Sequence, residues 1–136
     1  MPRKPLPADE VTRSIIGAFY EVYNHLGYGH LEHVYVLALE RELRARGRRV
    51  GREFSVRVMY KGEELAHERL DMVVDEAVVV EVKSTEVLSA HAGRQLLAYL
   101  RATNLEVGLL LHFGPRAVFH RFYAEDRLRH ARAPSG

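Results

Sequence analysis

Two acidic residues and a lysine stand on segments that are otherwise apolar. Residues 77–83 read AVVVEVK, and the run of valines predicts a central strand that is covered on both faces. Residues two apart in a strand point to the same face, so Glu81 and Lys83 share one side of the sheet. Each unpaired buried ion costs several kcal/mol. The strand therefore needs compensation, from mutual pairing, a metal ion or a water-filled cleft.

Asp71 supplies a second carboxylate on the preceding predicted strand. A three-residue loop over residues 75–77 places Asp71 opposite Glu81, on the same face of the hairpin. A two-residue loop would instead place Asp71 opposite Val80, on the wrong face. Adjacent carboxylates repel one another, so the pKa of one rises unless a cation lies between them.

These paired carboxylates predict a site for a hard divalent cation. Asp71, Glu81 and the backbone carbonyl of Val82 are oxygen ligands that suit Mg²⁺ or Mn²⁺. Such an ion lowers the pKa of bound water and stabilises charge on a phosphodiester. Lys83 could position or deprotonate the attacking water, because the pKa of a lysine can shift whereas an arginine stays protonated. A simple ion pair between Glu81 and Lys83 is the alternative.

Hydrophobic periodicity predicts the elements that hold these groups. Apolar spacings of three and four predict a helix from Asp9 that ends at Gly27, a second from Leu31 that ends at Gly47, and a third capped by Ser89. Strands are predicted over residues 54–60, 65–74, 77–83, 107–113 and 117–123. The order α-α-β-β-β-α-β-β predicts an α/β (mixed α+β) fold, with a mixed sheet flanked by helices. We expect one domain over residues 9–124, a flexible N-terminal tail over 1–8 and a charged C-terminal tail over 125–136.

Composition excludes several classes of protein. The 136 residues contain no cysteine, which excludes disulfides, thiolate zinc sites and a cysteine nucleophile. No apolar run approaches the ~20 residues of a membrane helix and no signal peptide is evident, so we expect a cytoplasmic protein that makes no contact with membranes. Serine-hydrolase and nucleotide-binding glycine motifs are absent.

Arginine is concentrated in residues 41–52, where six arginines occur. The net charge of +2 does not by itself predict nucleic-acid binding. The cluster is either a solvated face or a surface that faces a polyanion. The candidate phosphate contacts within it are Arg44, Arg46, Arg48 and Arg49.

Five short blocks resemble the bacterial GxxExxY family of the PD-(D/E)XK nuclease superfamily, which has the restriction-endonuclease-like fold. They are GHLEHVY at 29–35, RLD at 69–71, VEVK at 80–83, QLLAYL at 95–100 and GLLL at 108–111. The resemblance covers about residues 11–123. Leu70 stands where the superfamily has proline, and His112 where the family has asparagine.

The resemblance implies roles for the matching positions. Asp71 and Glu81 would be metal ligands and Lys83 the catalytic lysine. Glu32 resembles the helical glutamate that approaches the metal or its waters. Gln95 resembles the helix glutamine near the site of RecB-like nucleases.

Three further residues are candidates for lining the cleft. Tyr35 and Tyr99 either line it or pack as buried aromatics with bonded hydroxyls. His91 lies one turn before Gln95, on the same face of the predicted helix.

The function predicted from these residues is metal-dependent hydrolysis of nucleic acid, for which we expect DNA. A non-catalytic binding or adaptor module that retains the fold is the alternative, and a homodimer would give so short a chain more surface for specificity. A zinc site at His30, Glu32 and His33 is a further alternative, although the spacing lacks the HExxH pattern.

Overall fold

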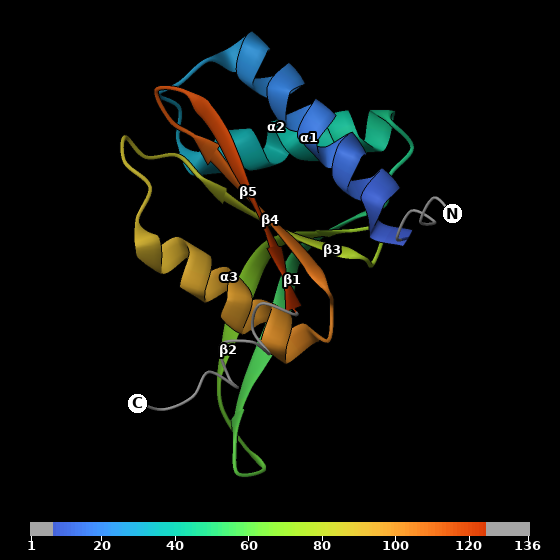
Figure 1. The fold of residues 1–136 in the computed structure, drawn as a ribbon, viewed down its shortest axis with the longest axis vertical. Helices are drawn as coiled ribbons and strands as arrows, with labels where there is room; N and C mark the ends of the chain where they lie inside the picture. Colours follow the sequence, from blue (N-terminus) through green and yellow to red (C-terminus); the bar gives the residue numbers. More distant parts are fainter. Residues whose placement is uncertain (1–6, 125–136) are drawn as a thin grey trace, which may run out of the picture.

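The computed structural model describes residues 7–124 of the chain. Three helices and five strands follow the predicted order (Figure 1). Their bounds are α1 Pro7–Leu26, α2 Glu32–Ala45, β1 Val50–Tyr60, β2 Glu63–Val74, β3 Val78–Lys83, α3 Ala90–Thr103, β4 Val107–Phe113 and β5 Ala117–Tyr123. The predicted mixed fold is confirmed.

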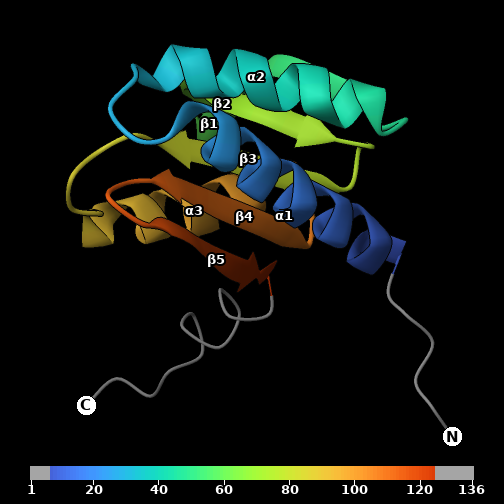
Figure 2. The ribbon, with the colours of Figure 1, turned by 90° about the horizontal axis from the view of Figure 1, so that it is seen from above.

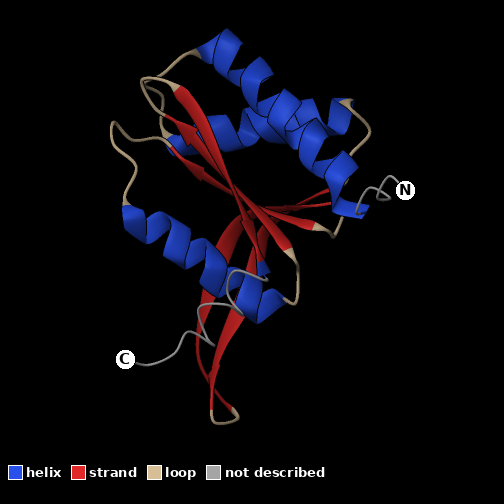
Figure 3. Ribbon diagram, viewed as in Figure 1, coloured by secondary structure: helices blue, strands red, loops and turns tan. Residues whose placement is uncertain are grey.

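The five strands form one sheet in the order β1-β2-β3-β4-β5. Neighbouring strands are antiparallel except β3 and β4, which are parallel and are joined by the crossover helix α3. Helices lie on both sides of the sheet (Figure 3). Helix α1 packs over β3, β4 and β5, while α2 packs over β1 and β3 (Figure 2). Helix α3 covers the other face.

Strands β3 and β4 are the most deeply buried part of the sheet. Val78, Val80 and Val82 contribute to the core under α1 and α2, while Val79 faces α3. Burying a valine or leucine side chain contributes about 1.5–3 kcal/mol. The predicted two-sided burial of β3 is confirmed, and this strand gives the charged groups at its end a rigid support.

The turn between β2 and β3 has three residues, one more than the expected strand bounds left, and this is the length that places Asp71 opposite Glu81. The pairs Met72–Val80, Val73–Val79 and Val74–Val78 set the register. Both Asp75 and Glu76 have positive φ angles, of 52° and 54°, and the Asp75 carboxylate accepts the backbone N–H of Arg49 at 2.7 Å. Continuing this register places Asp71 opposite Glu81.

The β1–β2 hairpin extends beyond the rest of the sheet (Figure 1). Its turn, Lys61–Gly62, has two positive φ angles, which match a tight hairpin turn. The alternation of Phe54, Val56, Val58 and Tyr60 with polar residues predicts a strand with one buried face, yet Phe54 is 45% and Tyr60 58% exposed. The prediction of burial was wrong there because the described helices leave the outer part of the hairpin uncovered.

Helix α1 begins at Pro7, two residues before the start expected for the domain, so the predicted tail over 1–8 overlaps the helix. Proline is tolerated in a first helical turn because its missing N–H has no partner there anyway. The rest of that predicted tail, and the tail predicted over 125–136, lie outside the described residues. Within residues 7–124, no helix combines the length and apolar character that crossing a membrane requires.

Candidate active site

The carboxylates of Asp71 and Glu81 lie where β2 and β3 stop pairing. Beyond the Met72–Val80 pair, the Asp71 N–H donates to Oε1 of Glu81 at 3.1 Å. The Val82 N–H donates to Oδ2 of Asp71 at 2.8 Å. Each carboxylate is therefore held by the backbone of the opposite strand, and these bonds satisfy N–H groups where the ladder ends.

Burial disfavours ionisation of both carboxyl groups, and like charge adds to this for Glu81. Glu81 is 5% exposed. Burial raises the pKa of Glu81 to about 8, the charge of Asp71 adds to the rise, and Lys83 opposes it. Burial also raises the pKa of Asp71, although the Val82 N–H and the charge of Lys83 oppose that shift. The pair is therefore a place where positive charge is stabilised.

Glu32 begins α2 and joins this acidic group. Burial and the charge of Asp71 raise the pKa of Glu32, while Lys83 and the Ser84 N–H lower it. The Ser84 hydroxyl also donates to the His30 carbonyl at 2.7 Å. The start of α2 is thus tied to the loop that follows β3, and the charges of Glu32, Asp71, Glu81 and Lys83 act on one another.

Tyr35 is a buried aromatic that shapes the turn before α2. Its hydroxyl donates to the Gly27 carbonyl at 2.6 Å and accepts the His30 N–H at 3.2 Å. Its ring stacks on Phe113, with centroids 4.1 Å apart. Gly29 has φ 117°, which residues with a Cβ rarely adopt. Tyr35 therefore packs instead of lining a cleft, and it holds the backbone that leads into Glu32.

A cavity of about 380 Å³ opens beside Asp71, and two arginines that we did not place in the site line it. It is lined by Glu32, Asp71, Arg52 and Arg69, among others. The charge of Arg52 opposes the rise that burial causes in the pKa of Asp71. Arg52 Nη1 is 3.1 Å from Glu40, and its buried Nε has no hydrogen-bond partner.

No sequence signal identifies Arg52. Simple alternation would put it on the face of Phe54 and Val56. However, Glu53 between them has a positive φ of 55°, and Arg52 lies against Glu40 of α2 while Phe54 and Val56 lie on the side of α3. Arg69 gave only a weak signal, as the first residue of the block that ends in Asp71.

The four arginines predicted to contact phosphate lie at the other end of α2, roughly 20 Å from Glu32 at 1.5 Å per residue. Three of them form ion pairs at 3.0 Å: Arg44 with Glu40, Arg46 with Glu42, and Arg48 with both Asp75 and Glu10. Arg49 holds Asp75 through its backbone N–H. The structure does not bring these side chains to the carboxylates. The physical reason is that Glu32 begins α2 whereas these arginines lie at or beyond its end, where Arg44, Arg46 and Arg48 pair with nearby acidic groups.

Helix α3 brings Tyr99 beside the acidic group. Burial raises the pKa of the Tyr99 hydroxyl, as do the charges of Glu81 and Glu68 and a hydrogen bond to Glu68. Gln95 is half-buried one turn earlier, and His91 is exposed at the start of the helix. The His91 backbone N–H donates to Oγ of Ser89, which confirms the predicted cap.

Comparison with known proteins assigns the fold. A family model described as the PD-(D/E)XK nuclease superfamily matches residues 9–122. The chain belongs to the PD-(D/E)XK nuclease superfamily. The search of curated proteins found no match.

Solved structures include two that resemble this superfamily member. The crystal structure of SSO0001 has a TM-score of 0.55 and 20% sequence identity, over 93% of this chain and 69% of that chain. An alkaline exonuclease (LHK-Exo) from Laribacter hongkongensis has a TM-score of 0.47 and 13% identity, over 93% of this chain and 76% of that chain. At 20% identity, the first likeness shows the fold alone.

His112, where this PD-(D/E)XK chain departs from the resembling family, holds the loop after β3. It is 7% exposed and pairs with Lys83 across the parallel strands. Its Nε2 lies 2.8 Å from the Thr85 carbonyl and 3.1 Å from the Thr85 hydroxyl. A Cβ on Gly114 would stand 2.6 Å from this ring, so glycine is needed there. His112 therefore fixes the backbone next to Lys83 and Ser84.

The donor set suits the divalent metal ions that nucleases of this superfamily generally use. Among residues 7–124, no group of three or more histidine, aspartate or glutamate side chains forms a ready metal cage. The zinc alternative at His30, Glu32 and His33 therefore gains no support. Mg²⁺ usually keeps several waters and needs only one or two carboxylates, which Asp71 and Glu81 provide. Their raised pKa values, caused by burial and, for Glu81, also by repulsion, would be lowered by a bound cation.

Proposed function

We propose that this protein is a metal-dependent nuclease of the GxxExxY family that hydrolyses phosphodiester bonds of DNA. One observation carries the proposal. Glu81 is buried and Asp71 half-buried, each carboxylate accepts a backbone N–H from the opposite strand where β2 and β3 stop pairing, and the charges of Lys83 and Glu32 act on them. Burial at such a cost points to a site that binds a cation.

Asp71, Glu81 and the carbonyl of Val82 would hold Mg²⁺ or Mn²⁺, and Glu32 would accept hydrogen bonds from its waters. The ion would lower the pKa of bound water and neutralise charge on the phosphate. Lys83 orients or deprotonates the attacking water. Gln95 approaches the reacting groups from α3.

Arg52 and Arg69 would orient the phosphate, because they line the same cavity as Asp71. An arginine presents several N–H donors in a fixed fork that matches phosphate oxygens. Glu40 and Arg44 hold Arg52 in position, because Glu40 accepts hydrogen bonds from the guanidinium groups of both Arg44 and Arg52. The cluster at 41–52 would thus serve the site through Arg52, not through direct phosphate contacts by Arg44, Arg46, Arg48 and Arg49.

A cleavage panel tests the proposal. Labelled single- and double-stranded DNA and RNA would be incubated with the purified protein in Mg²⁺, in Mn²⁺ and in chelator. We expect cleavage of DNA in either metal and none in chelator. Cutting that persists in chelator, or no cutting of any substrate, would contradict the proposal.

The adaptor alternative predicts that the protein binds no metal, so a calorimetric titration with Mn²⁺ discriminates between the two functions. A cytoplasmic location and a homodimer stay predictions from the sequence, and sedimentation of the purified protein would test the second.

A further inference from the structure

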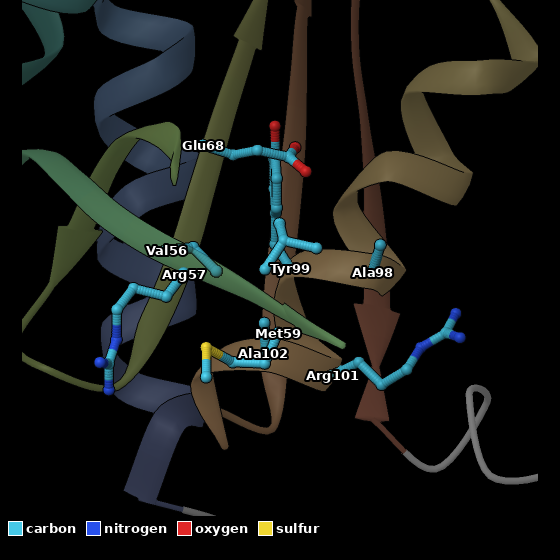
Figure 4. Close-up of a pocket in the computed structure, with 9 residues that line it drawn as sticks. Val56, Arg57, Met59, Glu68, Ala98, Tyr99, Arg101 and Ala102 are labelled. Carbon is cyan, nitrogen blue, oxygen red and sulfur yellow. The ribbon is translucent and has the colours of Figure 1, made fainter. Parts of the chain in front are cut away.

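A second hollow lies between β1 and the C-terminal half of α3, on the sheet face away from α1 and α2 (Figure 4). Its volume is about 360 Å³, and small-ligand sites measure about 300–1,000 Å³. The buried residues Val56 and Tyr99 lie at its base. A neighbouring hollow shares Val56, Arg57, Met59 and Ala102 with it and extends past Phe54. Together they form one groove, which we call the β1–α3 groove.

One end of the β1–α3 groove reaches the candidate active site. Tyr99 and Glu68 line that end, and the Tyr99 hydroxyl is hydrogen-bonded to Glu68. The charges of Glu81 and Asp71 both act on this hydroxyl. A ligand in the groove would therefore lie next to the carboxylates that the proposed function uses.

Two arginines flank the groove beside apolar side chains. Figure 4 shows Arg57 and Arg101 on opposite sides of it. Within residues 7–124, Arg101 makes no ion pair, and Arg57 reaches Glu64 only at 3.9 Å. Phe54 and Met59 are 45% and 49% exposed, although both are large and apolar. Alanine at position 102 leaves the groove open on the α3 side.

Proteins bind single-stranded nucleic acid with cationic side chains that neutralise its phosphates and with exposed aromatic or apolar side chains on which its bases stack. We propose that the β1–α3 groove binds a single-stranded stretch of the substrate next to the bond that is cut. Bases pack on Phe54 and Met59, and phosphates lie at Arg57 and Arg101. A duplex offers no free base faces to such a groove. The proposal rests on the proposed function, because it assigns the groove to the substrate of that site.

The test measures binding of a fluorescent single-stranded oligonucleotide and of a blunt duplex of equal length, by anisotropy in chelator so that nothing is cut. We expect Phe54→Ala to weaken single-strand binding at least about fivefold, since stacking on one aromatic side chain contributes that much. We expect Arg101→Ala to reduce the slope of log K against log salt by about 0.7, the loss of one phosphate contact to a single strand. Arg41→Ala is the matched control, because Arg41 is an exposed arginine on α2, over the other face of the sheet.

Three results would overturn the inference. The groove variants could bind like Arg41→Ala, duplex binding could fall in parallel with single-strand binding, or the wild type could bind no oligonucleotide. The last result would assign the groove to a protein partner.

A second readout separates this inference from the proposed function. Hydrolysis of bis(p-nitrophenyl) phosphate needs the metal site but no long substrate, so Phe54→Ala and Arg101→Ala should keep the wild-type rate. Asp71→Asn should lose hydrolysis yet keep oligonucleotide binding. If no protein hydrolyses the diester while the groove variants still weaken binding, the proposed function fails, and the groove is left as a single-strand binding site with no cleaved bond beside it. If the wild type cuts DNA and the groove variants bind normally, only the groove assignment fails.

Discussion

At the scale of single residues, the fold places Glu81 where burial disfavours its negative charge. Glu81 is bonded to the backbone of Asp71 and packed at the end of a buried strand, yet its ionised form is disfavoured there. A folded-state pKa above the unfolded value means that the unfolded chain releases its proton first as pH rises. The metal-free protein should therefore become less stable between about pH 4.5, the ordinary value for glutamate, and about pH 8, the raised value.

Replacing Glu81 tests this account. Glu81→Gln mimics the neutral acid, so we expect the metal-free variant to unfold at a higher temperature than the wild type at about pH 9, with the gap closing below about pH 4.5, where both proteins are uncharged at this position. Thermal unfolding followed by circular dichroism across this range is the measurement. A gap that is constant with pH would mean that the carboxylate is not the cause.

Lys83 is the residue whose chemistry arginine cannot reproduce. Lys83→Arg keeps the positive charge beside Glu32, Asp71 and Glu81, but an arginine cannot be deprotonated at working pH. We expect the variant to bind Mn²⁺ and to cut DNA about 10²-fold more slowly or worse, the typical loss when general acid–base catalysis is removed. Single-turnover cleavage and calorimetry measure the two properties.

Lys61→Arg is the matched control, since Lys61 lies in the exposed hairpin turn. Equal cleavage rates for Lys83→Arg and Lys61→Arg would contradict a role of Lys83 in proton transfer.

At the scale of elements, the site depends on three contacts to the loop after β3 and the start of α2. Ser84 binds the start of α2, His112 binds Thr85, and Tyr35 holds the turn that precedes Glu32. None of these three contacts involves the carboxylates of Asp71 and Glu81, and each of them holds a backbone carbonyl in place. Helix α2 therefore holds Glu32 close to Asp71 only if these contacts keep its first turn in place.

Tyr35→Phe removes the anchor while keeping the stacked ring. The Gly27 carbonyl and the His30 N–H lose their shared partner, so we expect a loss of about 1–3 kcal/mol in the free energy of unfolding. Urea denaturation measures it, with Tyr20→Phe as the control because Tyr20 is 40% exposed. An unchanged unfolding free energy would show that water replaces the hydroxyl at no cost.

The sequence limits the register of the β2–β3 hairpin to two alternatives, because the parity of Asp71 and Glu81 is a local property, but it does not choose between a two-residue and a three-residue loop. It predicts the partners of Arg48 poorly, since Glu10 and Asp75 come from distant segments. The role of Arg52 is hidden for the same reason. Alternation in β1 says which residues share a face, but it does not say whether any helix covers Phe54 or Tyr60.

At the scale of the whole molecule, the net charge of +2 generates little attraction for nucleic acid. The proposed function therefore requires local groups for substrate affinity, such as Arg52 and Arg69, which line the cavity beside Asp71. Metal should also stabilise the fold as a whole, because a ligand that binds only the folded state adds free energy of about 2.7 kcal/mol at 100 times its Kd.

Metal binding therefore gives a prediction for the intact protein. Adding Mn²⁺ should raise the Tm of the wild type, and chelator should reverse the rise. The increase should grow with pH, because the carboxylates must lose their protons before they bind a cation. Asp71→Asn should show no increase, and a normal increase in that variant would place the metal elsewhere.

The most direct test of the central claim compares cleavage of labelled DNA by the wild type and Asp71→Asn, with Arg41→Ala as a purification control, in Mn²⁺ and in chelator. Our account predicts cutting by the wild type and Arg41→Ala in Mn²⁺ only, and none by Asp71→Asn. Equal cutting by Asp71→Asn and the wild type would contradict it, because the activity would then not arise at the Asp71–Glu81 pair.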